Sequence, residues 1–257
     1  KDNRIGFSKA DKDATDLTIN IAENPNFADL DLTLTPPAEQ TITQADQSKA
    51  EANNARLKEE DAIRNKYIAT FIDSASAANL AMEKGVNIDE TWRYLKLSRG
   101  NWQEIYNFIK ELDGKDLTVG LAILNSISEK DLHDITASTL QDHIATVDSF
   151  PSIIDSRDFK DFDKYVLSPR IGREFVTPWR SFLQNSFTFD EIGFFRNNPY
   201  SIAKWIKENI TIDKESNYYK VPISPESVFK LRVADEYSRD VFFVAACRSF
   251  GIPARLE

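Results

Sequence analysis

The sequence predicts a mainly α-helical chain with short β-strands near its N-terminus. Apolar residues recur at helical spacing through most of the later part of the chain. Capping residues and glycines such as Ser128, Gly85 and Gly251 divide this part into short helices. The alternation of polar and apolar residues that is typical of strands is found at 16–22 and 29–35.

Composition narrows the class of function. The chain has 257 residues, of which 41% are hydrophobic, and this is enough for a sizeable core in one or two domains. The net charge is −9, and Lys and Arg are scattered, so nucleic acid is not expected as a partner. No apolar run reaches the ~18 residues of a membrane span. A single cysteine excludes an internal disulfide and a Cys-rich metal site.

Residues 1–37 are expected to be a remnant of a preceding β domain. "DLTINIA" (16–22) and "DLDLTLT" (29–35) read as its last strands, separated by the turn-like "ENPN". The start lacks the apolar segment of a signal peptide. At the other end, the sequence stops after the last helix, at residues that read as the beginning of a strand. We therefore expect the chain to be a fragment of a longer protein.

Residues 38–150 are expected to form a helical array. The stretch 39–62 lacks an apolar face, so it is either a solvated helix or a flexible linker. Just beyond it, apolar residues return at helical spacing, which predicts packing; they are Ile63, Tyr67, Ile68 and Phe71. Short helices are then predicted at 74–84, 88–97, 101–112, 116–127 and 129–147.

Caps predict further helix boundaries. In the array, Ser128 is expected to be an N-cap with Asp131 as its capping-box partner. Three later helices are predicted to begin at a capping residue followed by proline, at Thr177-Pro178, Asn198-Pro199 and Ser224-Pro225.

The last predicted helix covers 236–250. Asp235 is its expected N-cap, and Gly251 its C′ residue, ahead of Pro253. Five apolar side chains are expected to be its buried face: Val241, Phe243, Val244, Cys247 and Phe250.

"SRDVFFVAACRSFGIPAR" (238–255) resembles the central helix of the transglutaminase-like superfamily, which has a papain-type cysteine nucleophile. The matching residues are Arg248 and the run from Gly251 to Arg255. "NNPYSIAKWIKENITID" (197–213) is similar to the helix that precedes the active site in this family. The resemblance implies that 151–257 is the helical first half of a papain-like α+β core. It also implies a large bacterial surface protein, and hence an extracytoplasmic location.

The resemblance places the family's nucleophile at the start of this helix, about fifteen residues before Gly251. That position is Glu236. Cys247 lies eleven residues later, about 16 Å along a helix. A thiolate is stabilised at a helix N-terminus and opposed at the C-terminus. We therefore interpret Cys247 as a buried structural residue and expect no catalytic residue in this chain.

His133 and His143 are the only histidines, and both fall in the array. Ten residues apart, they cannot form an i, i+4 metal pair, so they are interpreted as helix-surface residues beside carboxylates. No metal or other cofactor is expected. The resemblance implies that the family's His and Asp follow Gly-Ile-Pro-Ala-Arg, beyond Glu257.

Two functions remain open. The first is a non-catalytic module that binds a protein, a peptide or a glycan. The second is a cysteine peptidase or acyl transferase whose remaining triad residues lie beyond residue 257.

Overall fold

The computed structural model is mainly helical and describes residues 6, 10, 13–22, 44–145, 147, 161–215 and 217–257. Contacts divide the chain into two units, Lys1–Glu59 and Glu60–Glu257. The three domains proposed from the sequence have different boundaries, which stay a prediction.

In the first unit, the strand predicted at 16–22 does not form. Residues 16–21 have no regular secondary structure and are exposed, and Ala22 makes an isolated bridge. Alternation stabilises a strand only where one face is buried, and no such burial is present here. The second predicted strand, 29–35, lies outside the described residues.

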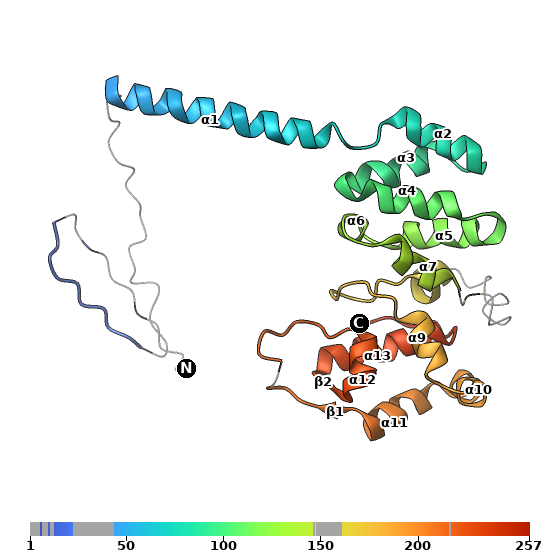
Figure 1. Ribbon diagram of the computed structural model, residues 1–257. Helices are drawn as coiled ribbons and strands as arrows, with labels where there is room; N and C mark the ends of the chain where they lie inside the picture. Colours follow the sequence, from blue (N-terminus) through green and yellow to red (C-terminus); the bar gives the residue numbers. More distant parts are fainter. Residues whose placement is uncertain are drawn as a thin grey trace. The chain divides into compact units, whose positions relative to one another are not determined.

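The helix α1 (Gln44–Ile68) covers much of the stretch 39–62, for which the sequence allows either a solvated helix or a flexible linker (Figure 1). It is exposed from Asp46 to Ile68, as expected for a solvated helix. The packing predicted for its end is wrong, because Ile63 is 65% and Tyr67 59% exposed. Tyr67 meets the array only at its edge, where its hydroxyl lies against Gly100 and its ring against Phe71.

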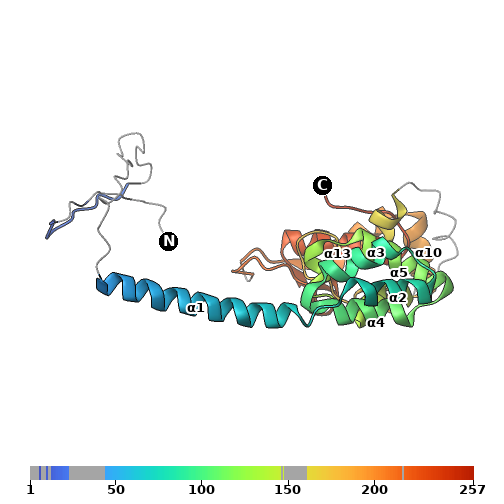
Figure 2. The same cartoon turned by 90° about the horizontal axis from the view of Figure 1, so that it is seen from above.

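In the second unit, the helices of the array stack in chain order and lie over the C-terminal helices (Figures 1 and 2). Two of them, at 74–84 and 88–97, have the predicted bounds, with Asp73 and Asn87 as side-chain caps. The array comprises α2 (Ser74–Lys84), α3 (Ile88–Leu97), η2 (Arg99–Asn101), α4 (Trp102–Glu111), α5 (Gly114–Ser126), α6 (Glu129–Leu132) and α7 (Ala137–Ala145).

The single helix predicted at 129–147 is in fact two, α6 and α7. The predicted capping box of Ser128 and Asp131 does start α6. Thr136 then interrupts the helix, because its hydroxyl accepts a hydrogen bond from the N–H of Thr139 at 3.2 Å. Glu104 of α4 accepts the N–H of Ala137 at 2.7 Å, so α7 is capped partly from another helix.

The C-terminal part surrounds α13 with shorter helices (Figure 1). β1 and β2 pair in parallel, with Thr211 opposite Val233. This pair, like α10, had not been predicted from the sequence. The elements are η5 (Asp163–Leu167), α9 (Arg180–Asn185), α10 (Phe189–Asn197), α11 (Tyr200–Asn209), β1 (Thr211–Ile212), α12 (Pro225–Leu231), β2 (Val233–Ala234) and α13 (Glu236–Ser249).

Two of the three predicted caps ahead of proline are displaced. Ser224 does cap α12, but α11 begins one residue late, with Pro199 at the cap position. The helix α9 begins at Arg180, so Thr177 does not cap it. The carboxylate of Asp142 on α7 instead accepts the N–H of Arg180 at 3.0 Å. A neighbouring helix thus supplies the missing cap.

Aromatic side chains hold the C-terminal helices together. Phe250, the C-cap residue of α13, stacks on Phe195 with ring centroids 5.6 Å apart, and Phe187 meets Phe250 edge-on at 5.4 Å. Trp205 of α11 stacks on Phe229 of α12 at 5.7 Å. Such pairs add to the free energy gained from burying the rings.

The buried face predicted for α13 needs one correction. Phe242 is 1% exposed and belongs to the core, whereas Phe243 is only partly buried. The helix turns about 100° per residue, so these neighbours face different surroundings. The other four residues predicted for this face are buried.

We predict that Phe242→Ala lowers the free energy of unfolding by about 3–5 kcal/mol, because it leaves a cavity in the aromatic cluster. Phe243→Ala should cost less than about 2 kcal/mol, because less apolar area is lost. Denaturant unfolding of both variants checks this. Equal losses would contradict the assignment of the two faces.

Candidate functional site

The helix α13 carries the candidate site, and both of its ends form as predicted. The side chain of Asp235 accepts the N–H of Ser238 at 2.8 Å. At the other end Gly251 has φ of 76°, a left-handed conformation that favours glycine. The N–H of Gly251 donates to the Arg248 carbonyl and that of Ile252 to the Cys247 carbonyl, which is a Schellman motif.

Glu236, the residue at the expected nucleophile position, is the first residue of α13. Its side chain is 58% exposed, and its Oε1 lies 2.8 Å from the Nζ of Lys214. The hydrogen bond and charge of Lys214 lower the pKa of Glu236. The helix start therefore presents a carboxylate that is ionised at neutral pH.

The start of α13 is fixed by the segment that leads to it. Asn217 donates to Asp235, and Ile223 donates its N–H to the Ser238 hydroxyl at 2.9 Å. The Tyr237 hydroxyl accepts the N–H of Arg173 at 2.7 Å. These bonds hold the first turn of the helix in one orientation.

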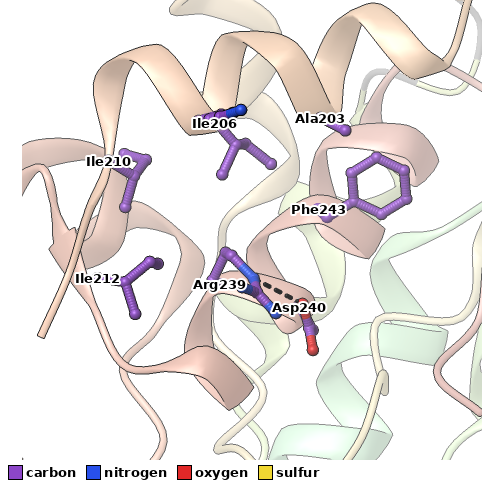
Figure 3. A pocket seen from close by; sticks show the side chains of 8 residues that line it. Ala203, Ile206, Ile210, Ile212, Arg239, Asp240 and Phe243 are labelled. Atoms are coloured by element: carbon purple, nitrogen blue, oxygen red, sulfur yellow. Dashed lines mark hydrogen bonds and ion pairs between the residues drawn. The ribbon is translucent and has the colours of Figure 1, made fainter. Parts of the chain in front are cut away.

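An apolar groove of about 440 Å³ runs between α11 and α13 (Figure 3). Ile206 and Ile210 of α11 and Phe243 of α13 form much of its wall. Arg239 and Asp240 pair with each other at 2.7 Å beside it. Residues 236, 240 and 243 follow i, i+4, i+7 spacing, so the groove shares its helix face with Glu236.

Cys247 lies at the far end of α13 and is 1% exposed. Burial raises the pKa of its thiol to about 12. Eleven residues separate it from Glu236, about 16 Å along the helix axis. A thiol in this state is a poor nucleophile at neutral pH.

Two buried arginines bind backbone carbonyls around this end of α13. Arg248 donates to the carbonyls of Ser168 at 2.8 Å, Arg170 at 2.7 Å and Ala254 at 2.9 Å. Arg180 of α9 donates to the carbonyl of Arg248 itself at 2.7 Å. The helix end is thereby joined to α9 and to the segments on both sides of it.

Burial lowers the pKa of both guanidinium groups. It lowers the pKa of Arg180 to about 9, with repulsion from Arg248 adding to the effect. It lowers the pKa of Arg248 to about 10, although the charge of Glu174 partly opposes this. Both side chains remain protonated at neutral pH.

A second charged cluster joins the array to the C-terminal part. Arg170 donates to both carboxylate oxygens of Asp131 on α6. Glu174, which is 2% exposed, accepts the N–H groups of Ile171 at 3.0 Å and Gly172 at 2.9 Å. Burial alone would raise the pKa of Asp131, but the bonds from Arg170 and Ser128 outweigh it and lower the pKa.

The structure separates the two histidines. His133 is partly exposed beside Glu129, as expected for a helix-surface residue. His143 is fully buried, which corrects the prediction for it, and its Nε2 lies 3.0 Å from the Thr177 carbonyl. Within the described ranges, neither histidine has a hydrogen bond to Glu236 or Cys247. Nor do those ranges hold a group of three or more His, Cys, Asp or Glu that could bind a metal ion.

Residues 195–257 match the family model of the transglutaminase-like superfamily. The match begins in α10 and includes both ends of α13. Searches of curated proteins and of solved structures found no match. Among the described helices, none has the length and apolar composition needed to cross a membrane.

Sequence reasoning missed several residues around α13. Lys214, Arg170 and Arg180 lie far from it in the chain, and no local pattern indicated that they would reach it. Only α10 had a readable signal, because Thr188 and Glu191 form a capping box with the expected spacing.

We predict that His143 makes the fold sensitive to mild acid. Burial, aided by the charges of Arg180 and Arg248, lowers its pKa well below the usual value, while its bond to the Thr177 carbonyl opposes this. Asp142, the adjacent carboxylate, is engaged in capping α9. The unfolded chain therefore binds a proton near pH 6.5 that the folded chain rejects.

The stability that His143 contributes is present above about pH 6.5 and is lost as the pH falls toward the folded-state pKa, by at most about 1.4 kcal/mol per unit. Unfolding measured from about pH 7.5 to about pH 5 should show this slope. His143→Phe should flatten it, and the control His133→Phe should not. An unchanged slope in His143→Phe would disprove the assignment.

Proposed function

We propose that the C-terminal part of this chain is a non-catalytic transglutaminase-like module that binds a protein or peptide segment. The observation that carries the proposal is the pair of side chains at the two ends of α13. The expected nucleophile position holds Glu236, paired with Lys214, and the single cysteine is buried at the opposite end. An interaction role requires no thiolate, so it agrees with both features.

The groove between α11 and α13 is the surface that we assign to the partner. Its apolar wall suits one or two apolar side chains. Lys207 at its rim is exposed, and in the described part of the chain its ammonium group has no ion pair. A peptide with apolar residues next to an acidic residue complements this surface in shape and charge.

The alternative is a cysteine peptidase or acyl transferase that uses Cys247. This function requires the thiol to be partly ionised near neutral pH and within reach of a base. The raised pKa and the burial of Cys247 count against it. We further propose a bacterial surface protein in an extracytoplasmic location, supported by the family resemblance of the sequence.

Selection of random peptides displayed on phage against the full chain tests the binding role. We expect enriched peptides that combine apolar residues with a neighbouring Asp or Glu. Phe243→Asp and Lys207→Glu should each lower the affinity for a synthetic peptide of this kind by about tenfold or more. The first removes part of the apolar wall, and the second removes the positive charge that complements the acidic residue.

The matched control is Lys204→Glu, which changes an exposed lysine that pairs with Glu208 on the same helix. It should leave the affinity unchanged. The proposal fails if no peptide is enriched, or if enriched peptides bind Phe243→Asp as tightly as the unmodified chain.

A further inference from the structure

A second cleft lies in the helical array, apart from the groove beside α13. It is a shallow space of about 680 Å³ between the residues that lead into α2 and one face of α4. Aromatic rings and uncharged polar groups share its lining. The residues that matter are Phe71, Asp73, Trp102, Gln103, Tyr106 and Asn107.

The aromatic wall of this cleft is held in place by contacts within the protein. The indole Nε1–H of Trp102 donates to the Thr70 carbonyl at 3.1 Å. The rings of Trp102 and Tyr106 meet edge-to-face, with centroids 6.1 Å apart and planes at 85°. The Nζ of Lys110 lies 5.7 Å from the centre of the Tyr106 ring. The two rings are therefore already fixed in orientation before a ligand binds.

Two amide side chains line the cleft beside these rings. Gln103 and Asn107 are exposed and lie one turn apart on α4, so they share its outer face. Among the described residues, no protein group is hydrogen-bonded to either amide. Each amide offers two donors and one acceptor oxygen.

The charge of the lining decides which ligand fits. Asp73 is the one carboxylate among the described residues of the lining, and it already caps α2 by accepting the Ser76 N–H at 2.7 Å. No Lys or Arg is among the described residues that line the cleft, so the lining offers an anion no ion-pair partner. A neutral ligand with an apolar face and many hydroxyls suits the rings and the amides together.

We propose that this cleft binds a neutral glycan. The indole of Trp102 stacks on the apolar face of a pyranose ring, and Gln103 and Asn107 bind its hydroxyls. This inference does not depend on the peptide-binding role proposed for the groove. Of the residues that the structure describes, none lines both surfaces, so either proposal can fail alone.

The test titrates the full chain with neutral oligosaccharides of glucose, mannose, galactose and N-acetylglucosamine, followed by calorimetry and by tryptophan fluorescence. We expect at least one of these series to bind and to change the emission of Trp102. Trp102→Ala should weaken that binding at least about tenfold. Trp102→Phe should retain part of it, because a flat ring remains.

The double variant Gln103→Ala/Asn107→Ala should weaken binding to a similar degree. These amides are exposed and make no hydrogen bond within the described part of the chain, so the variant keeps its fold and provides a test even if Trp102→Ala does not. Trp92→Phe, a change of a partly buried tryptophan on α3, is the matched control and should bind normally.

Three results would overturn the proposal. One is the absence of binding across the whole set of oligosaccharides. Another is binding that Trp102→Ala and the double variant leave intact. The third is binding of choline in place of sugars, lost in Asp73→Asn, which would make the cleft an aromatic site for cations.

Discussion

The carbonyl contacts of Arg180 and Arg248 are the constraint on which the C-terminal structure depends. A buried guanidinium is costly unless nearly all of its donors are satisfied. Here backbone carbonyls from η5, the segment after it, α13 and the residues after α13 accept bonds from both groups, while the Nε of Arg180 has no partner among the described residues. Each of these segments must reach its place for the charges to be tolerated. The two side chains thereby specify one arrangement of α9 and α13.

Fixing this end of α13 determines what the rest of the helix can do. Arg248 and the Schellman motif keep the last turn inside the protein, so Cys247 is buried. The first turn lies outside, where Lys214 and Asn217 hold its carboxylates. Exposed charge at one end and buried apolar packing at the other agree with the supporting helix and the binding face that we propose. The macrodipole favours an anion at the exposed end, where Glu236 supplies it.

Local signals in the sequence predicted the elements that are stabilised locally. Ser128, Ser224 and Asp235 all cap helices where their spacing indicated, because a cap is a contact within a few residues. The prediction that Thr177 caps a helix was wrong, because Asp142, from a helix far away in the chain, accepts the N–H of Arg180 instead. Tertiary contacts of this kind leave no mark on local spacing.

The candidate site was predicted to a similar extent. The start of α13 at Glu236 followed from Asp235 as its cap, and the burial of Cys247 followed from its spacing on the apolar face of the helix. The groove could not be predicted, because it depends on how α11 packs against α13. For the same reason, the sequence could not show that Phe243 lines the groove while Phe242 fills the core.

The most direct measurement of the central claim is the rate of alkylation of Cys247 by iodoacetamide as a function of pH in the native chain. With a pKa of about 12 and a buried sulfur, the reaction should be slow. It should show no midpoint between about pH 6 and about pH 9, and unfolding in urea should accelerate it greatly. Fast alkylation with a midpoint near neutral pH would mean that Cys247 is an accessible thiolate and would contradict the account.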